Sequence, residues 1–427
     1  MATTTTTVPK SILIAGAGIA GPALALLLTN AGYTCTIVER APDFRSSGQQ
    51  IDVAGEGLKV IKHLGIEDAC YANRVEDDGI KFVDVHDAVL ASFAASKEAG
   101  SLVKELEILR PDLARVIFEA GREKGGVEYL FGESVAAVKQ DEKGVTVTFA
   151  TSKKEQTFDI LVAADGLRSH TRTLAFEDSN TTFVKFNQFA GYFSIPWAES
   201  DGTWSRWMNA PGGRCVSTRP NRKRGITSAY LCQITPDAER IATMPVGDAK
   251  KEITERFRGV GWETDRILSH LTNPDNEEKG FYCQEVAQSK SQRLVTGRVA
   301  LLGDAGYCPS PISGQGSTLA LVGAYILAGC ISLHPNDIER GLREYEKQIR
   351  PFIDTAQNLP PGVPWIVNPQ TGTGIAVLNQ TLKVVGGVVN SGVAGMVGRV
   401  LTPLGSLLGG GKAPVLPDFP QIHARGT

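Results

Sequence analysis

The sequence lacks the cysteine patterns that build disulfide frameworks or zinc sites. Its seven cysteines are an odd number and include no C-x-x-C pair, which favours free thiols in a reducing compartment. The first ten residues contain a run of threonines and no apolar segment, so we expect no secretory signal. Together these two features predict a cytoplasmic protein that carries no metal site.

A net charge of either sign is also nearly absent. The 46 acidic and 44 basic residues leave a formal charge of −2, which gives no field to attract nucleic acid or a membrane surface. No stretch has the roughly 20 uninterrupted apolar residues that a membrane-spanning helix needs. We therefore expect no nucleic-acid partner and no membrane contact. At 427 residues with 42% hydrophobic residues, the chain is long enough for two or three domains.

What the sequence does contain begins with an alternation of strand and helix. Ser11–Ala15 reads as a short buried strand, Ile19–Ala31 as an Ala- and Leu-rich helix, and Thr34–Glu39 as a β-branched strand. A right-handed crossover makes the two strands of such a unit parallel. The start of the chain thus predicts a doubly wound α/β domain.

Two later apolar strands end in glycine and aspartate. Asp159–Ala164 is followed by Asp165-Gly166, and Arg298–Leu302 is followed by Gly303-Asp304. The long apolar stretch Thr318–Ile331 then reads as a buried helix. Because ligands of open α/β sheets bind at the carboxyl ends of the strands, we expect one site assembled from these distant pieces.

The middle of the chain has a different hydrophobic pattern. Short alternating runs such as Phe189–Ile195 and Ile226–Ile234 predict antiparallel strands, and Asp248–Leu271 has apolar residues near helical spacing, which predicts one helix. After Asp354, up to Lys412, the only formal charges are Lys383 and Arg399. This tail either closes a pocket between the lobes or docks on a membrane or partner, and its missing polar face favours burial.

We therefore predict an α/β fold with a Rossmann-like dinucleotide-binding domain, an inserted mixed-sheet substrate domain and a C-terminal helical segment. The Rossmann-like domain would be discontinuous and comprise residues 8–75, 103–180 and 285–335. The substrate domain would comprise residues 76–102 and 181–284. Residues 336–427 would form a helical, apolar tail that bridges the lobes, in which the role of residues 355–411 is open.

A glycine-rich turn lies between the first strand and helix. Gly16-Ala17-Gly18-Ile19-Ala20-Gly21 is G-x-G-x-x-G, in which the glycines permit a tight turn, a close approach to a pyrophosphate and close packing of helix on strand. Glu39 ends the next strand, where an acid can accept hydrogen bonds from ribose hydroxyls. In the alternative interpretation these glycines form an ordinary turn, and Glu39 merely ends an exposed strand.

Two further motifs select the dinucleotide. The chain reads A-A-D-G-L-R-S around Asp165 and L-L-G-D-A around Asp304, followed by Gly314-Gln315-Gly316. Together with the glycine-rich turn, in this order, they resemble the aromatic-hydroxylase class of flavoprotein monooxygenases, which includes para-hydroxybenzoate hydroxylase and the tetracycline-inactivating monooxygenase. The resemblance extends from Ser11 to about Cys330 and implies tightly bound, non-covalent FAD.

The resemblance also implies roles for matching residues. Asp304 would bind the ribityl chain, and the turn from Pro311 to Gly316 would lie along the isoalloxazine. Arg110 would lie near the FAD phosphates, and Asp165 near both FAD and the nicotinamide nucleotide. Alternatively, Asp165 is only a helix cap and Arg110 only a surface arginine. The predicted FAD contacts are Gly16, Gly18, Ile19, Ala20, Gly21, Glu39, Arg40, Arg110, Asp165, Gly166, Gly303, Asp304, Pro311, Gly314, Gln315 and Gly316.

The sequence departs from the family at one place and has no second nucleotide fingerprint. Many relatives follow Gly-Asp-Ala with Ala-His, where this chain has Gly306-Tyr307, so no proton-transfer role transfers to this position. Cys308 next to it is either a packed thiol, which we favour, or a covalent flavin link. NADH or NADPH would dock transiently on the FAD domain, where Arg45 is a possible contact or an ordinary solvated arginine.

The implied activity is hydroxylation of an aromatic, phenolic or polyketide-like small molecule of secondary metabolism, with NAD(P)H, dioxygen and a flavin C4a-hydroperoxide. Alternatives are halogenation, dehydrogenation, epoxidation or FAD binding without turnover. Phe193-Ser194-Ile195-Pro196 lacks the tryptophans of halogenases. The protein would be a monomer or homodimer, and no histidine stands out as a general base. Pocket candidates, each alternatively a core residue, are Gln50, Tyr192, Trp204, Trp207, Met208 and Arg214.

Overall fold

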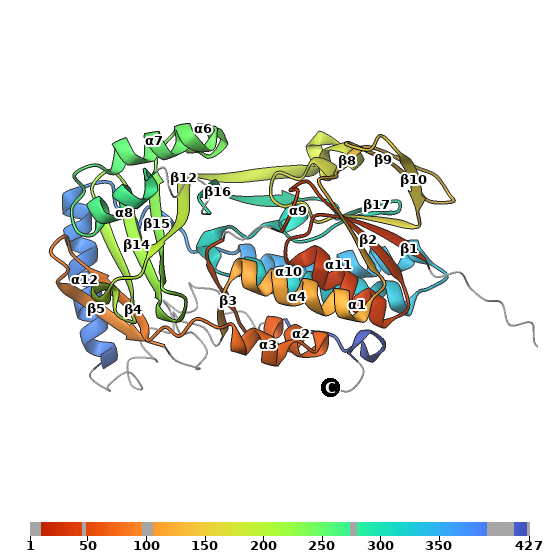
Figure 1. Ribbon diagram of the computed structural model, residues 1–427, viewed down its shortest axis with the longest axis horizontal. Coiled ribbons are helices and arrows are strands. Elements are labelled where there is room, and N and C mark those ends of the chain that lie inside the picture. Colours follow the sequence, from red (N-terminus) through yellow and green to blue (C-terminus); the bar gives the residue numbers. More distant parts are fainter. Residues whose placement is uncertain (1–9, 45–47, 96–105, 274–279, 391–413, 425–427) are drawn as a thin grey trace, which may run out of the picture.

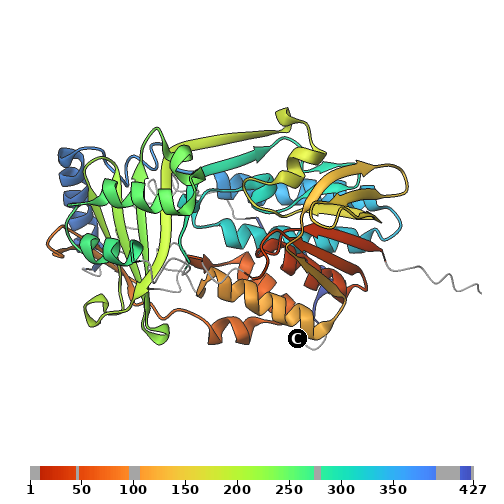
Figure 2. The same cartoon turned by 45° about the horizontal axis from the view of Figure 1, so that its top comes forward.

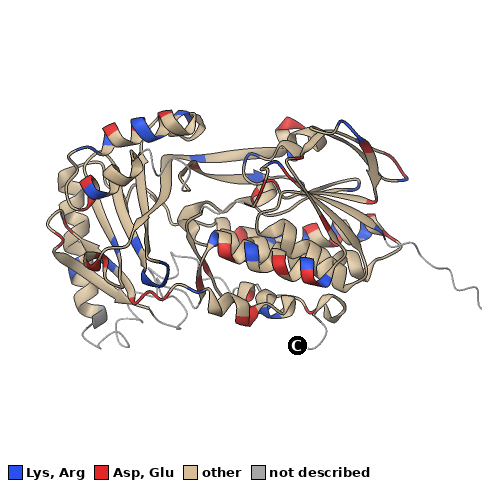
Figure 3. Cartoon of the chain, in the orientation of Figure 1, with Lys and Arg blue, Asp and Glu red and all other residues tan. Residues whose placement is uncertain are grey.

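The structure, a computed structural model, describes residues 10–44, 48–95, 106–273, 280–390 and 414–424. Two bodies lie side by side along the long axis (Figure 1), and the long strands β12 (Thr181–Pro196) and β16 (Tyr282–Ser291) run from one to the other. Arg45, the possible nucleotide contact, lies outside the described residues. Basic and acidic residues are interspersed over the outer helices (Figure 3), as the near-zero net charge requires.

The first body contains the predicted parallel sheet. Strands β1 (Ser11–Ala15), β2 (Thr34–Glu39), β7 (Val127–Phe131), β11 (Ile160–Ala163) and β18 (Val299–Leu301) are parallel, and β17 (Val295–Thr296) adds an antiparallel edge in the order β17-β18-β11-β1-β2-β7. Ile12, Leu13 and Ile14 are fully buried, because helices and a second sheet cover the two faces. The predicted α/β fold is confirmed.

The helices of this body pack around one apolar helix, α10 (Gly316–Leu333). It contacts α1 (Ala20–Asn30), α2 (Glu56–Leu64) and α11 (Ile338–Gln357). α10 is long and apolar enough to cross a membrane, but 72% of it is buried inside the body, so it is built as a core helix. The remaining elements of this body are α3 (Glu67–Ala72), α4 (Arg110–Lys124), α5 (His170–Ala175), α9 (Asp304–Tyr307), β8 (Val135–Gln140), β9 (Val145–Phe149) and β10 (Glu155–Phe158).

The second body is a seven-stranded mixed sheet in the order β16-β12-β15-β14-β13-β4-β5. Its pairs are antiparallel except for the parallel pair β13 and β4. Three helices cover one face (Figure 2). The further elements are β4 (Gly79–Val83), β5 (Val89–Ala94), β13 (Ser205–Ala210), β14 (Arg214–Asn221), β15 (Ile226–Ile234), α6 (Ala238–Thr243), α7 (Val246–Phe257) and α8 (Thr264–Leu271).

The segment Asp248–Leu271 is helical as predicted, but it forms two helices rather than one. The segment forms α7 and α8, separated by residues 258–263. Gly259 and Gly261 in this gap have φ values of +69° and +89°, a left-handed conformation that glycine adopts at little cost and that ends a helix. The apolar spacing survives the break because both helices bury residues against the same sheet face.

The segments between and beyond the bodies connect them. The two-stranded ribbon of β3 (Gln50–Val53) and β6 (Leu106–Leu109) lies between the bodies in Figure 1. After α11 the chain returns to the second body, where α12 (Gly372–Asn390) packs on β5 and β13. Residues 414–424 then dock on the first body against α1 and α10. The predicted domain boundaries stay a prediction.

Candidate cofactor and substrate site

The glycine-rich turn has the geometry of a phosphate cradle. Gly16 has φ +115° and packs directly on the carbonyl of Ala164 at the end of β11. A Cβ on Gly21 would overlap the carbonyl of Gly16, so α1 approaches β1 as closely as the third glycine predicts. Ile19 and Ala20 begin the helix in buried positions. Among the described residues, no side chain caps the N-terminus of α1, which leaves its N–H groups for an anion.

Arg110 lies at this turn. It is the first residue of α4 and follows β6 directly. Its Nη2 lies 3.4 Å from where a Cβ of Gly18 would be, and its backbone N–H donates to the Gln49 carbonyl at 3.0 Å. A guanidinium held against the glycine-rich turn supports the interpretation of Arg110 as a phosphate ligand.

Glu39 ends β2 beside the same turn, and Arg40 follows it. The Glu39 carboxylate accepts hydrogen bonds of 3.0 Å from the backbone N–H groups of Ala17 and Ala41. Glu39 therefore stabilises the turn, in addition to lying where the ribose contact is predicted. Arg40 is exposed.

Asp304 follows β18 at the same carboxyl edge of the parallel sheet as the glycine-rich turn. Gly303, with φ +63°, packs on Ala20 of α1 and directs the chain into α9, where Asp304 is the first residue. Solvent reaches the Asp304 side chain, although burial by the surrounding protein raises the pKa of its carboxyl, with the charge of Arg110 opposing this. The two predicted FAD contacts therefore lie close enough for their charges to interact.

The turn after α9 leads into α10, the second helix at this site whose N-terminus has no side-chain cap among the described residues. Pro311 lies in a short 3-10 turn, Gly314 has φ +62°, and Gln315 precedes the first residue of α10, Gly316. In the part of the chain that the structure describes, no side chain caps this N-terminus and its first turn holds no acid. A helix N-terminus of this kind stabilises a negative charge that lies close to its free N–H groups.

Asp165 has a structural role in this protein. Its carboxylate accepts hydrogen bonds from the Thr171 backbone N–H at 3.0 Å, the Thr171 hydroxyl at 2.9 Å and the Ser169 hydroxyl. It thereby holds the loop that leads into α5, beside Gly166 with φ +86°. The helix-cap interpretation accounts for these bonds, and a contact of Asp165 with a nucleotide remains a prediction.

Three tyrosines form a wall opposite the Pro311 turn. The rings of Tyr192 and Tyr230 meet edge to face at 5.1 Å, and Tyr192 and Tyr282 stack at 4.9 Å. Tyr192 belongs to a small apolar cluster, against which Tyr230, Tyr282, Ile312 from the turn and Leu359 after α11 all pack. Burial raises the pKa of Tyr192, and raises that of Tyr230 to about 12, so the wall presents neutral hydroxyl groups at pH 7.

Two glutamines connect this wall to Arg110. The Gln50 backbone N–H donates to the Tyr230 hydroxyl at 3.1 Å, and the Tyr282 hydroxyl donates to the Gln49 side chain. Gln50 is 3% exposed, and its Oε1 has no hydrogen-bond partner among the described residues. The start of β3 thus lies between the predicted phosphate ligand Arg110 and the tyrosines and is hydrogen-bonded to both.

The six predicted pocket residues lie in three places. Gln50 and Tyr192 lie at the wall, and Trp207 lies farther along the same sheet face, since its register partner Ser217 is opposite Tyr230. Met208 is buried in the core on the helix-covered face. Arg214 also points there, because its Nη1 donates to the Arg256 carbonyl at 2.7 Å. Trp204 lines a separate small cavity with Lys81.

Sequence reasoning missed part of this assembly. The missed residues are Gln49, Tyr230, Tyr282, Arg219, Asp52 and Glu107. Asp52 and Glu107 carry a sequence signal, because each is the one acid in a short strand, QIDV and LEIL, and the strand of Glu107 is otherwise apolar. Tyr230 falls at alternate spacing within a predicted strand, but alternation does not tell which face meets the cofactor.

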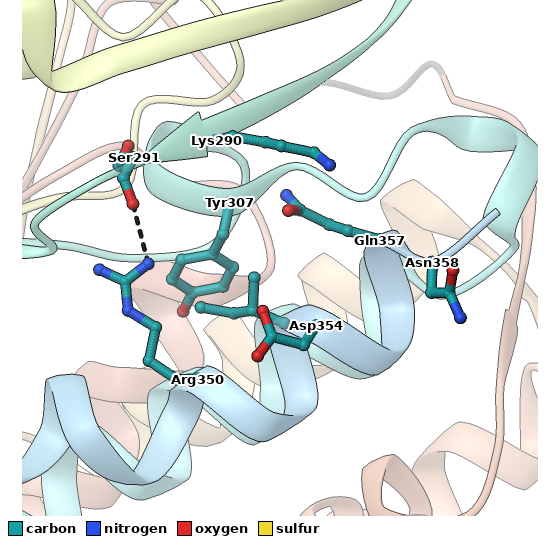
Figure 4. A pocket seen from close by; sticks show the side chains of 8 residues that line it. Lys290, Ser291, Tyr307, Arg350, Asp354, Gln357 and Asn358 are labelled. Atoms are coloured by element: carbon teal, nitrogen blue, oxygen red, sulfur yellow. Dashed lines mark hydrogen bonds between the residues drawn. The ribbon is translucent and has the colours of Figure 1, made fainter. Parts of the chain in front are cut away.

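Tyr307 stands where many relatives have histidine, and it points away from the tyrosine wall. Its hydroxyl lies 3.0 Å from the Tyr345 hydroxyl, which donates to the Leu301 carbonyl at 2.7 Å. A cavity of about 520 Å³ beside it (Figure 4) is lined by Lys290, Ser291, Tyr307, Arg350, Ile353, Asp354, Gln357 and Asn358. Tyr307 therefore packs α9 on α11. Cys308 is a buried free thiol whose Sγ contacts the Ala287 carbonyl.

Comparisons with known proteins agree with this geometry. The family model described as FAD binding domain matches residues 10–358. The chain is 34% identical over 373 residues to the FAD-dependent monooxygenase asL6 of Sarocladium schorii, covering 82% of this chain and 86% of that protein. It is 31% identical to the monooxygenase CTB7 of Cercospora beticola, covering 88% and 92%. The crystal structure of tetracycline destructase Tet(55) superposes with a TM-score of 0.75 at 27% identity, covering 96% and 99%.

Proposed function

The chain belongs to the FAD-binding-domain family and is a FAD-dependent monooxygenase, and we propose that it hydroxylates an aromatic or polyketide-like molecule held against the tyrosine wall. The observation that carries the proposal is the position of this wall. Ile312 of the turn that precedes α10 packs on the same apolar cluster as Tyr192, so an acceptor held against the wall would lie beside the predicted isoalloxazine position. Names of similar proteins, which include a tetracycline destructase and a p-nitrophenol monooxygenase, support this substrate class.

FAD fits the residues that are present. The uncapped N-terminus of α1 and Arg110 would bind the pyrophosphate, Glu39 the adenosine ribose, and Asp304 the ribityl chain. The N-terminus of α10 would face the pyrimidine edge and favour the anionic reduced state. When bound, FAD supplies hydride acceptance from NADH or NADPH and activation of dioxygen.

The protein's own residues would orient the acceptor and exclude water. Neutral hydroxyls of Tyr192 and Tyr230 offer directional hydrogen bonds in an otherwise apolar wall. So does the side-chain carbonyl of Gln50, which has no hydrogen-bond partner among the described residues. The segment after α11 would cover it. Leu359 packs on the tyrosine cluster, Val367 accepts from the Asn209 amide at 2.9 Å, and α12 follows on β5 and β13. A covered pocket keeps water from the reaction.

Spectroscopy and turnover test the proposal. We expect purified protein to show a flavin absorbance spectrum and to oxidise NADH or NADPH faster when a phenol or fused-ring polyketide is added. Incorporation of ¹⁸O from labelled dioxygen into the product would identify hydroxylation. Bound FAD without stimulation by any compound of a broad panel would contradict the proposed substrate class and favour another flavin reaction. Localisation in the cytoplasm and a monomeric or dimeric state remain proposals.

A further inference from the structure

A half-buried and a buried carboxylate, those of Asp52 and Glu107, face each other on the ribbon that joins the bodies. Asp52 of β3 is the direct register partner of Glu107 of β6. Like charges at opposed positions of an antiparallel pair repel each other, and Glu107 is only 4% exposed. A third carboxyl, Asp77 before β4, is close enough for its charge to act on Glu107. The ribbon therefore concentrates acid where the protein excludes water.

One guanidinium is inserted between them. Arg219 of β14 lies 2.5 Å from the Glu107 carboxylate and 3.6 Å from that of Asp52. Among the described residues, the Glu107 oxygens have no hydrogen-bond partner beyond this ion pair, and no set of His, Cys, Asp or Glu is arranged to hold a metal. One cation among three acids leaves a net negative charge, and a buried excess charge of this kind is relieved by retaining a proton.

Burial raises the pKa of Glu107 to about 8, with Arg219 opposing the shift and Asp52 and Asp77 adding to it. Burial raises the pKa of Asp77 as well, in spite of its bonds to Ser205 and Gly79. The charged or titratable groups around Glu107 are therefore Arg219, Asp52 and Asp77, with Tyr230 near Arg219. Glu107 therefore holds its proton to a higher pH than an ordinary glutamate does.

The cluster touches both halves of the proposed site. The Arg219 carbonyl accepts from the Gln50 side chain at 3.5 Å, and the Gln50 backbone N–H donates to the Tyr230 hydroxyl. On the other side, β6 runs from Glu107 into Arg110 within three residues. A change in the position of Arg219 is thus transmitted to Gln50 and the tyrosine wall on one side and to the predicted phosphate ligand on the other.

We propose that Glu107 is a positioning residue for the monooxygenase reaction, which together with Asp52 fixes Arg219 and so sets the geometry of Gln50 and Tyr230. This inference rests on the proposed function. Ionised Glu107 leaves a second uncompensated negative charge beside a site whose reduced cofactor is anionic, so the protonated form is the active one. Glu107 acts through Arg219 and is not one of the predicted FAD contacts.

The test compares wild type with four variants, all as holoenzymes. The probe is the compound of the phenol and polyketide panel that most stimulates NAD(P)H oxidation, followed from pH 6 to 9.5. We expect the stimulated rate of wild type to fall as pH rises through about 8. Glu107→Gln, which mimics the protonated acid, should keep its rate across this range. Glu107→Ala should lose at least tenfold at every pH while it retains FAD.

Asp52→Asn tests the coupling between the two acids. Removing the neighbouring negative charge lowers the pKa of Glu107, so the decline in rate should move to lower pH. Glu285→Gln is the matched control, because Glu285 is also a buried acid with a raised pKa, paired with Arg168 at 3.7 Å but on the helix-covered side of β16. Its pH profile should equal that of wild type.

A measurement without turnover separates failure of this inference from failure of the proposed function. Glu107 has a higher pKa folded than its ordinary 4.5, so wild type loses stability relative to Glu107→Gln as pH rises from about 5 to 8. Urea unfolding at these pH values measures the difference. Equal pH dependence of the two proteins in both unfolding and rate would overturn the proposal. If no compound stimulates wild type, the proposed function has failed, and equal pH dependence of unfolding in wild type and Glu107→Gln then overturns this inference as well.

Discussion

At the scale of single residues, the carboxyl group of Asp304 is subject to two opposing effects. Burial by the surrounding protein raises its pKa, and the positive charge of Arg110 lowers it. Asp304 is nevertheless exposed to solvent next to the glycine-rich turn, so hydroxyl donors of a bound sugar chain can reach its carboxylate. The residue is thus better matched to a ligand than to a purely structural role.

Asp304→Asn is therefore expected to weaken FAD binding. A hydrogen bond to a charged group contributes about 1.5–3 kcal/mol, which corresponds to roughly ten- to a hundredfold in Kd. Equilibrium titration of apoprotein with FAD, followed by flavin fluorescence, measures the loss. Glu119→Gln, on the exposed side of α4, serves as the control. An unchanged Kd in Asp304→Asn would refute the assigned role.

At the scale of elements, the C-terminal segment acts as a clamp on the first body. Phe419 and Ile422 are buried between α1 and α10, and the Phe419 ring lies directly on Gly329, where a Cβ would overlap it. The Phe419 backbone N–H donates to the Tyr325 hydroxyl at 3.0 Å. The clamp therefore supports α10, whose other end is the uncapped N-terminus at the site.

Removing the clamp's anchor should destabilise the first body. Phe419→Ala leaves a cavity against α10 and should lower the free energy of unfolding by about 3–5 kcal/mol. Gly329→Ala should have a similar direction, because the added methyl displaces the same ring. Urea denaturation measures both. If the double variant costs as much as the sum of the two single variants, the two residues do not share one contact.

The clamp also packs against a titratable side chain of the first body, His63. His63 of α2 stacks on His423 at 3.8 Å, and the Tyr325 hydroxyl lies 2.9 Å from the His423 ring nitrogen. Burial lowers the pKa of His63, with His423, Lys62 and Lys59 acting in the same direction and Asp418 opposing. A histidine whose pKa is lower in the folded protein than its ordinary 6.5 stabilises the fold at pH values above 6.5. This stability is lost as the pH falls from 6.5 through the folded pKa.

His63→Phe keeps the ring stack and removes the titration. When the pH is lowered from 8 to 5.5, the Tm of wild type should fall more than the Tm of this variant. The difference in Tm, variant minus wild type, should therefore increase. Differential scanning calorimetry at constant ionic strength measures the gap. A gap that does not change with pH would contradict a role for His63 in acid sensitivity.

At the scale of the whole molecule, two cores are joined by β12, β16 and the β3/β6 ribbon. One core surrounds the parallel sheet, and another fills the space between the mixed sheet and helices α6, α7 and α8. The predicted FAD contacts all come from the first body, whereas the tyrosine wall belongs to the second. Cofactor binding and acceptor binding therefore depend on different cores.

A core substitution in the second body should separate these two functions. Phe257 is fully buried beneath the mixed sheet, and Phe257→Ala should cost about 3–5 kcal/mol of stability while FAD affinity stays within about twofold of wild type. Fluorescence of bound FAD and of tryptophan during urea unfolding distinguishes the two bodies. Loss of FAD in parallel with the second core would show that the bodies unfold as one.

The sequence by itself determined the local geometry of the cofactor side. G-x-G-x-x-G, Gly303-Asp304 and the Pro311–Gly316 turn require particular φ values and close backbone approaches, which only certain residue types permit, so their positions could be predicted. The opposed acids Asp52 and Glu107, the guanidinium between them and the tyrosine wall come from strands whose pairing is set by long-range register. Only the tertiary structure decided which face of each strand meets the site, because alternation fixes the two faces but not their neighbours.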